Sequence, residues 1–193
     1  MSEKPKHDPL GDRRKALEEE FFRKHNDRLA TELRLRRLAE ESKASMSRVS
    51  GIADDAVLDK LVELGIGAGT LAAMTLVPLV EVAWADGKMD AKEREAILEG
   101  ADAAGVEPGG DAYALLEDWL ENRPPPRLLA AWRDYIGALC EEMLPEDRKE
   151  LKREVLSQAR RVAEATGGFL GIGDKVSDEE RQVYGILETA FKV

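Results

Sequence analysis

The sequence is poor in the residues that build disulfide frameworks, zinc sites and aromatic clusters. It contains one cysteine, two histidines and 5% aromatic residues in a chain of 193. The single cysteine, Cys140, excludes an internal disulfide framework and is typical of a reducing compartment. His7 and His25 lie far from Cys140 in the chain, so no zinc-ligand spacing exists. The first 50 residues are densely charged and contain no signal peptide, so we expect a cytoplasmic protein.

The sequence also lacks the alternating, β-branched runs that predict strands. Apolar-periodic segments are instead preceded by capping residues and followed by Gly or Pro, which indicates successive helices. The composition, with 43% hydrophobic and 35% charged residues, fits helices packed through Leu and Ala. Residues 70–85 form an apolar helical segment that Pro78 should break near Val77. We therefore predict an all-α fold, a compact multi-helix bundle of about eight helices.

A long charged helix is expected to precede this bundle, because residues 12–43 contain no Gly or Pro. Its apolar positions are sparse, so it should pack along one narrow stripe, either on the body or on a second chain. The Ser-rich residues 42–51 are typical of a linker. The predicted organisation is an N-terminal helical arm with its linker at residues 1–50, followed by a helical domain at residues 51–193.

Charge is unevenly distributed between these two regions. Residues 1–50 hold 13 Lys or Arg and 10 Asp or Glu, whereas residues 51–193 hold 16 and 29. Phosphate contacts need basic side chains, so the acidic body is a poor nucleic-acid binder and we predict no nucleic-acid partner. An acidic body suits cations or a basic partner, and acidic surfaces also keep proteins soluble without any specific ligand.

No set of residues in the sequence matches a catalytic arrangement. A Cys–His pair would need the arm to fold over the helix that carries Cys140, and a lone helical cysteine is usually a small core residue. Residues 67–72 match the dinucleotide pattern G-x-G-x-x-A, but no strand precedes them, so we expect a tight connection between helices. Residues 64–80 carry no charge, yet Gly and Pro interrupt them. This segment predicts a buried central helix, with peripheral membrane contact left open.

The most informative stretch is "VAWADGKMDAKERE" at residues 82–95. Laid on a calcium-binding EF-hand loop, Asp86, Asp90 and Glu93 fall at ligand positions. Val82 and Trp84 occupy two other ligand positions and offer no side-chain oxygen, so a full EF-hand is disfavoured. The same residues also make a complete turn into a helix, in which Asp90 is the N-cap and Glu93 closes a capping box. A weak divalent-cation site, for Ca²⁺ or Mg²⁺, remains an alternative at this turn.

A weaker copy of this stretch follows 87 residues later, where "DGKMDAKER" aligns with "GDKVSDEER". Ser177 and Glu180 again predict a capping box. The repetition is consistent with an internal duplication that places one helix hairpin in each half of the body.

This repeated pattern resembles the signature of TerB-like helical domains of the tellurite-resistance family. Residues 76–98 carry the strong part of the match, and the resemblance extends over residues 54–193. It implies a compact all-α fold with pseudo-duplicated helix hairpins and no enzymatic activity. It also implies a tellurite-resistance or stress-response setting, often near membranes.

The resemblance further implies divalent-cation binding by acidic residues at the two turns. The metal-site residues carried over are Asp86, Asp90, Glu93, Asp174 and Glu180. The second turn departs from the pattern, with Gly-Asp in place of Asp-Gly and a serine in place of the capping aspartate, and both changes weaken a cation site there.

We therefore expect a non-catalytic TerB-like interaction module whose N-terminal helix contacts a protein partner or a second copy of the chain. The alternative is a divalent-cation-binding regulatory domain that uses the turn at Asp86, Asp90 and Glu93. An enzyme built on acidic helices is a third hypothesis, for which the sequence offers no matched nucleophile, base and metal.

Overall fold

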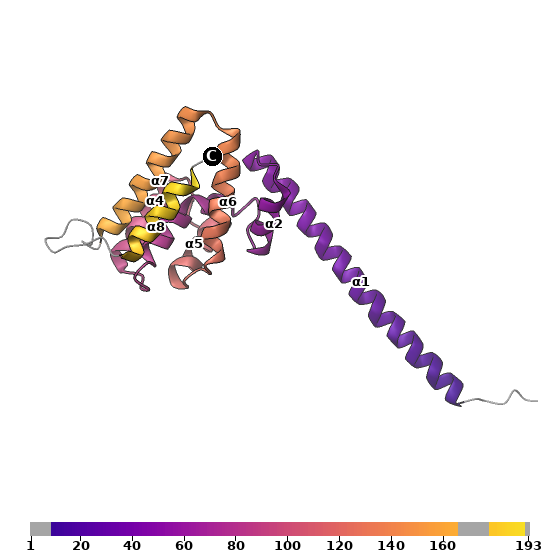
Figure 1. The fold of residues 1–193 in the computed structure, drawn as a ribbon. Coiled ribbons are helices and arrows are strands. Elements are labelled where there is room, and N and C mark those ends of the chain that lie inside the picture. The colour runs from indigo at the N-terminus through magenta and orange to yellow at the C-terminus, as the bar shows by residue number, and fades with distance from the viewer. Residues whose placement is uncertain (1–8, 166–177, 192–193) are drawn as a thin grey trace, which may run out of the picture. The chain divides into compact units, whose positions relative to one another are not determined.

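The computed structural model describes residues 9–165 and 178–191, and leaves some side chains near the starts of its first and last helices undescribed. The described residues form eight α-helices and one 3₁₀ helix, with no strand among them (Figure 1). The prediction of an all-α multi-helix bundle is therefore confirmed. The chain divides into two compact units, Met1–Glu41 and Ser42–Val193. We call the second unit the body, and residues 9–41 of the first unit the arm.

The first helix, α1 (Pro9–Ser50), is longer than predicted at both ends (Figure 1). Residues 42–50, predicted as a Ser-rich linker, continue the helix and belong to the body. Met46 is fully buried there, and Lys43 is buried with its Nζ 3.0 Å from Asp59 Oδ1. The Ser50 hydroxyl donates a hydrogen bond to the carbonyl of Met46 at 2.9 Å. The linker prediction is wrong because core contacts outweigh the weak helix propensity of serine.

Seven further α-helices build the body around one hydrophobic core. In chain order they are α2 (Asp55–Glu63), α3 (Val77–Ala83), α4 (Ala91–Ala103), α5 (Asp111–Glu121), α6 (Arg127–Glu142), α7 (Pro145–Ala165) and α8 (Asp178–Ala190). The short helix α3 contacts α4, α6, α7 and α8 and buries all but one of its side chains, so it is the centre of the core. The buried central helix predicted at residues 64–80 is confirmed only at its end, because α3 begins at Val77 and residues 64–70 form no helix. No described helix is both long and apolar enough to cross a membrane.

The break expected at Pro78 is present. A 3₁₀ helix, η1 (Leu71–Leu76), leads directly into α3, which places Pro78 in the first turn of the α-helix. Proline fits that turn because its missing N–H would have no partner within the helix. Before η1, Gly67 N–H donates to Thr70 Oγ1 at 2.9 Å and closes the tight connection expected at the dinucleotide-like pattern.

Two positive-φ glycines end α2 and α4 as expected from the sequence. Gly65 has a φ of 75° and Gly105 a φ of 71°. In each case the next residue donates its N–H back to the helix: Ile66 to Leu61 O at 2.9 Å, and Val106 to Ala101 O at 2.9 Å. Both of these following residues are buried, so each turn directs the chain into the core.

Candidate functional site

The turn between α3 and α4 begins with core residues. Val82 is buried, and the Trp84 indole Nε1 donates to the carbonyl of Trp119 at 2.9 Å. An EF-hand would require side-chain oxygens at these two positions. Here Val82 packs in the core and Trp84 hydrogen-bonds to α5. The absence of a full EF-hand, expected from the sequence, follows from this packing.

The three carboxylates of the turn each accept a hydrogen bond from the backbone. Asp86 Oδ1 accepts from Lys88 N–H at 2.9 Å, and Asp90 Oδ1 accepts from Lys92 N–H at 2.7 Å. Glu93 Oε2 accepts from Asp90 N–H at 2.9 Å, which completes the predicted capping box of α4. The turn also uses Gly87 at a φ of 86°. Asp86 therefore satisfies an N–H group of the turn, and Asp90 and Glu93 satisfy N–H groups at the start of α4, where negative charge suits the helix dipole.

The predicted metal-site residues whose side chains the structure describes, Asp86, Asp90 and Glu93, are not part of a metal-binding cluster. Within the described residues, no group of three or more His, Cys, Asp or Glu side chains is arranged to hold a metal ion. Asp174 and Ser177 lie outside the described residues. Glu180 is in the first turn of α8, but its side chain is not described. The geometry at Asp86, Asp90 and Glu93 is that of a capped helix.

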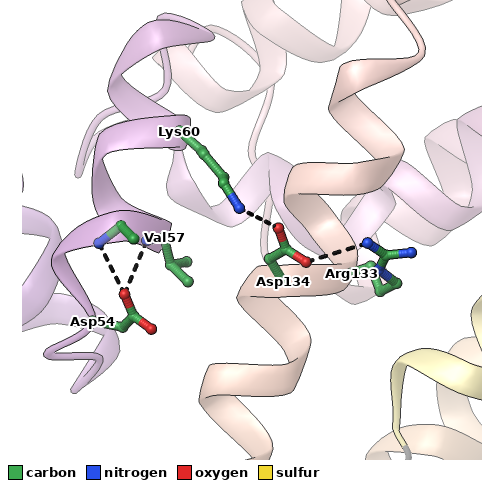
Figure 2. Close-up of polar contacts among 6 residues, drawn as sticks. Asp54, Val57, Lys60, Arg133 and Asp134 are labelled. Carbon is green, nitrogen blue, oxygen red and sulfur yellow. Dashed lines mark hydrogen bonds and ion pairs between the residues drawn. The ribbon is translucent and has the colours of Figure 1, made fainter.

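A polar cleft of about 440 Å³ lies on the body between α2, α6 and the end of α8. Figure 2 shows Lys60 of α2 pointing to Asp134 of α6, with a Lys60 Nζ to Asp134 Oδ2 distance of 2.6 Å. The other carboxylate oxygen of Asp134 lies 3.5 Å from Arg133 Nη2 (Figure 2). At the edge of the cleft, Asp54 accepts hydrogen bonds from Ala56 N–H at 2.8 Å and from Val57 N–H at 3.2 Å.

Two of the carboxylates that line this cleft, Asp54 and Asp134, already have partners in the body. Asp134 faces two cations, while Asp54 caps α2. The lining contains the cations Lys60 and Arg133 and the carboxylates Asp54, Asp134 and Glu141, so it has no excess of positive charge with which to hold an anion. The Lys60–Asp134 ion pair links α2 to α6 through two residues that are 74 positions apart in the sequence. No pattern in the sequence could have found it.

Burial raises the pKa of three titratable groups on the core helices, Glu81, Tyr135 and Cys140. Burial raises the pKa of the Cys140 thiol, against a smaller opposing influence of the positive charge of Arg148. Because the thiolate is the reactive form, a fully buried cysteine with a raised pKa is a poor nucleophile. Burial also raises the pKa of Glu81 on α3 to about 7, against the opposing charge of Arg123. The Oε1 atom of Glu81 is buried and has no hydrogen-bond partner.

The arm carries more exposed large hydrophobic side chains than the body does. Six large hydrophobic side chains are exposed among the described residues, and four of them lie within ten residues of α1. These four, which we call the leucine patch, are Leu29, Leu33, Leu35 and Leu38, with exposed fractions of 46%, 56%, 62% and 51%. At 3.6 residues per turn, Leu29 and Leu33 share one side of α1, and Leu35 and Leu38 lie on the opposite side. Exposed leucines one turn apart are typical of a helix that binds another protein surface.

Comparisons of the chain with models of known protein families, with curated proteins and with solved structures gave no match.

Proposed function

We propose that this chain is a non-catalytic helical interaction module in which the arm docks onto a protein partner through the leucine patch. The single observation that carries the proposal is the exposure of the patch, where each leucine keeps between 46% and 62% of its surface in water. Burying a fully exposed leucine side chain contributes roughly 1.5–3 kcal/mol, so a partner that covers the half-exposed pair Leu29 and Leu33 gains roughly half of that for each of them.

Charge on the arm adds specificity to this contact. Residues 23–37 contain six Lys or Arg and two Asp or Glu, so the surface around the leucines is basic. Charged residues at the rim of an interface mainly select the partner and accelerate the encounter. The leucines supply the affinity, and the surrounding arginines and lysines restrict which surfaces can approach.

The body is assigned to the TerB-like kind on the resemblance of its sequence. The stretch that carries the resemblance forms a helix, an Asp-Gly turn and a capped helix. A stress-response or tellurite-resistance setting in the cytoplasm rests on the resemblance and on the sequence composition alone. In this proposal the body is a stably folded domain, and the arm makes the contact with the protein partner.

The test compares proteins captured by the tagged full-length chain and by a variant, L29Q/L33Q, in cells that express the chain naturally. The proposal expects a small set of proteins to be lost with the variant. The matched control is L144Q, because Leu144 is 61% exposed but lies outside the arm. If both variants capture the same proteins as the unmodified chain, the leucine patch is not a docking surface.

A further inference from the structure

The middle of the arm consists mainly of leucine and arginine. Residues 28–38 of α1, which we call the Leu-Arg segment, contain four leucines, four arginines and one acidic residue, Glu32. Every residue of this segment is exposed. Arginine is enriched at protein interfaces, because its planar guanidinium group binds a carboxylate through two parallel hydrogen bonds. The composition of the Leu-Arg segment is therefore typical of an interface.

The leucines of this segment form two pairs on opposite sides of the helix. At 3.6 residues per turn, Leu29 and Leu33 lie about 40° apart around the helix axis. Leu35 and Leu38 lie about 60° apart, and the centres of the two pairs are separated by about 170°. The two pairs are exposed to a similar degree, at 46% and 56% for the first and 62% and 51% for the second. A flat partner surface that covers one pair therefore leaves the other pair in water.

Arginines accompany both leucine pairs. Arg36 follows Leu33 by three residues, and Arg34 precedes Leu38 by four residues, so each arginine neighbours one pair on the helix surface. Arg34 has no acidic residue three or four positions away, so the helix itself offers it no carboxylate. The whole segment carries four arginines against one glutamate. A surface that complements it has apolar side chains opposite the leucines and carboxylates beside the arginines.

We propose that the partner of the arm is an acidic protein with a groove that encloses the Leu-Arg segment from two opposite sides. One apolar wall of the groove contacts Leu29 and Leu33, and the other wall contacts Leu35 and Leu38. This inference rests on the proposed docking function and states the shape and charge of the partner. A helix that lies in a membrane surface buries one face only, so a lipid surface covers one leucine pair and leaves the other in water. Opposite apolar sides therefore favour a protein groove.

The first experiment identifies the partner by photo-cross-linking from both sides of the helix. The photoreactive residue p-benzoylphenylalanine replaces Leu33 in one variant and Leu38 in another, in cells that express the full-length chain naturally. We expect both variants to cross-link to the same protein, through peptides in which Asp and Glu outnumber Lys and Arg. The matched control carries the same group at Leu144, which is 61% exposed on the body, and should not cross-link to that protein.

Several results of this experiment would overturn the inference. Two different proteins bound at the two positions would mean that no single groove encloses the arm. Cross-links to basic peptides, or to a second copy of this chain, would contradict an acidic protein as the partner. A position that gives no cross-link at all would show that its side of the helix stays in water.

The second experiment measures the affinity of the purified cross-linked protein for the full-length chain by calorimetric titration. L29Q/L33Q and L35Q/L38Q should each bind roughly tenfold more weakly or worse, because each variant removes the burial of two half-exposed leucines. Glutamine has nearly the helix propensity of leucine, and circular dichroism checks that the arm stays helical. The matched control L144Q should bind as tightly as the unmodified chain.

The charge of the groove is tested with R34E. This variant should bind more weakly, and its deficit should shrink as the salt concentration rises, because salt screens the repulsion between Glu and the carboxylates of the groove. The matched control K149E reverses an exposed charge on α7 and should bind normally. If R34E binds as tightly as the unmodified chain, no carboxylate of the partner faces Arg34 and the acidic groove is excluded.

The outcomes separate this inference from the docking function on which it rests. If L29Q/L33Q loses affinity and L35Q/L38Q does not, the arm still docks, but through one side only. If neither variant loses affinity and L29Q/L33Q captures the same proteins as the unmodified chain, both the enclosing groove and the docking function are excluded. Binding of the full-length chain to vesicles of phosphatidylserine and phosphatidylcholine, lost in either leucine variant, would replace the protein groove with a lipid surface.

Discussion

Glu81 is an acidic side chain placed on the central helix of the core, and its removal should stabilise the protein at neutral and alkaline pH. Its Oε1 atom is buried without a hydrogen-bond partner, and burial raises its pKa from 4.5 to about 7. The substitution E81Q keeps the size of the side chain and removes the charge. Any effect that comes from the ionised carboxylate must then disappear.

The direction of the pH dependence follows from the raised pKa. Below pH 4.5 the carboxyl is protonated in both the folded and the unfolded chain, so it causes no difference between them. Between pH 4.5 and about 7 the unfolded chain loses this proton while the folded chain keeps it. Since the folded state then binds more protons, the free energy of unfolding falls as the pH rises. Well above pH 7 the carboxyl is ionised in both states, so the decrease in the free energy of unfolding stays constant.

The size of this loss follows from the shift. A rise from 4.5 to about 7, at about 1.4 kcal/mol per pH unit, sets an upper value near 3.4 kcal/mol. Glu81 retains some contact with solvent, which screens its charge, so we expect about 2 kcal/mol. E81Q should thus be more stable than the unmodified chain by about this amount at pH 8, and nearly equal to it at pH 4.5.

Urea unfolding followed by circular dichroism, repeated from pH 4.5 to pH 8, measures this difference directly. The matched control is V80A, a change at the neighbouring buried and non-ionisable position of α3. V80A should lower the free energy of unfolding by a constant amount at every pH. If the difference between E81Q and the unmodified chain is also constant across this range, Glu81 is not the buried titrating group that we infer.

Thermal and urea unfolding of four further variants tests the packing and capping of the body. G137A should raise stability by about 1 kcal/mol, because an added Cβ meets nothing within 4 Å in the interior of α6. G100A should be less favourable than G137A by about 1–3 kcal/mol, because its Cβ would lie 2.8 Å from Cδ2 of the buried Leu79; equal effects would refute the close approach. D90A should cost about 1 kcal/mol by removing the N-cap of α4, and an unchanged midpoint would argue against the capping box. M46A should cost about 2–5 kcal/mol, whereas a true linker at this position would tolerate it without loss.

The sequence predicted the local features of this fold well, because each depends on residues close together in the chain. The break at Pro78 and the capping box of Asp90 and Glu93 involve contacts over at most one helical turn. The disfavoured EF-hand was also decidable locally, since Val82 and Trp84 carry no side-chain oxygen. The linker prediction failed at residues 42–50 because Lys43 reaches an acidic residue of α2, and no local pattern encodes that contact.

The sequence by itself determined that the chain is helical, where most helices begin and end, and how charge is arranged along the arm. These properties follow from side-chain chemistry at spacings of three to seven residues. Only the tertiary structure decided that Glu81 is partly buried on the central helix, that Lys60 of α2 pairs with Asp134 of α6, and that the end of α1 belongs to the body. The physical reason is that burial and long-range ion pairs depend on which helices pack together, and packing is set by the whole chain at once.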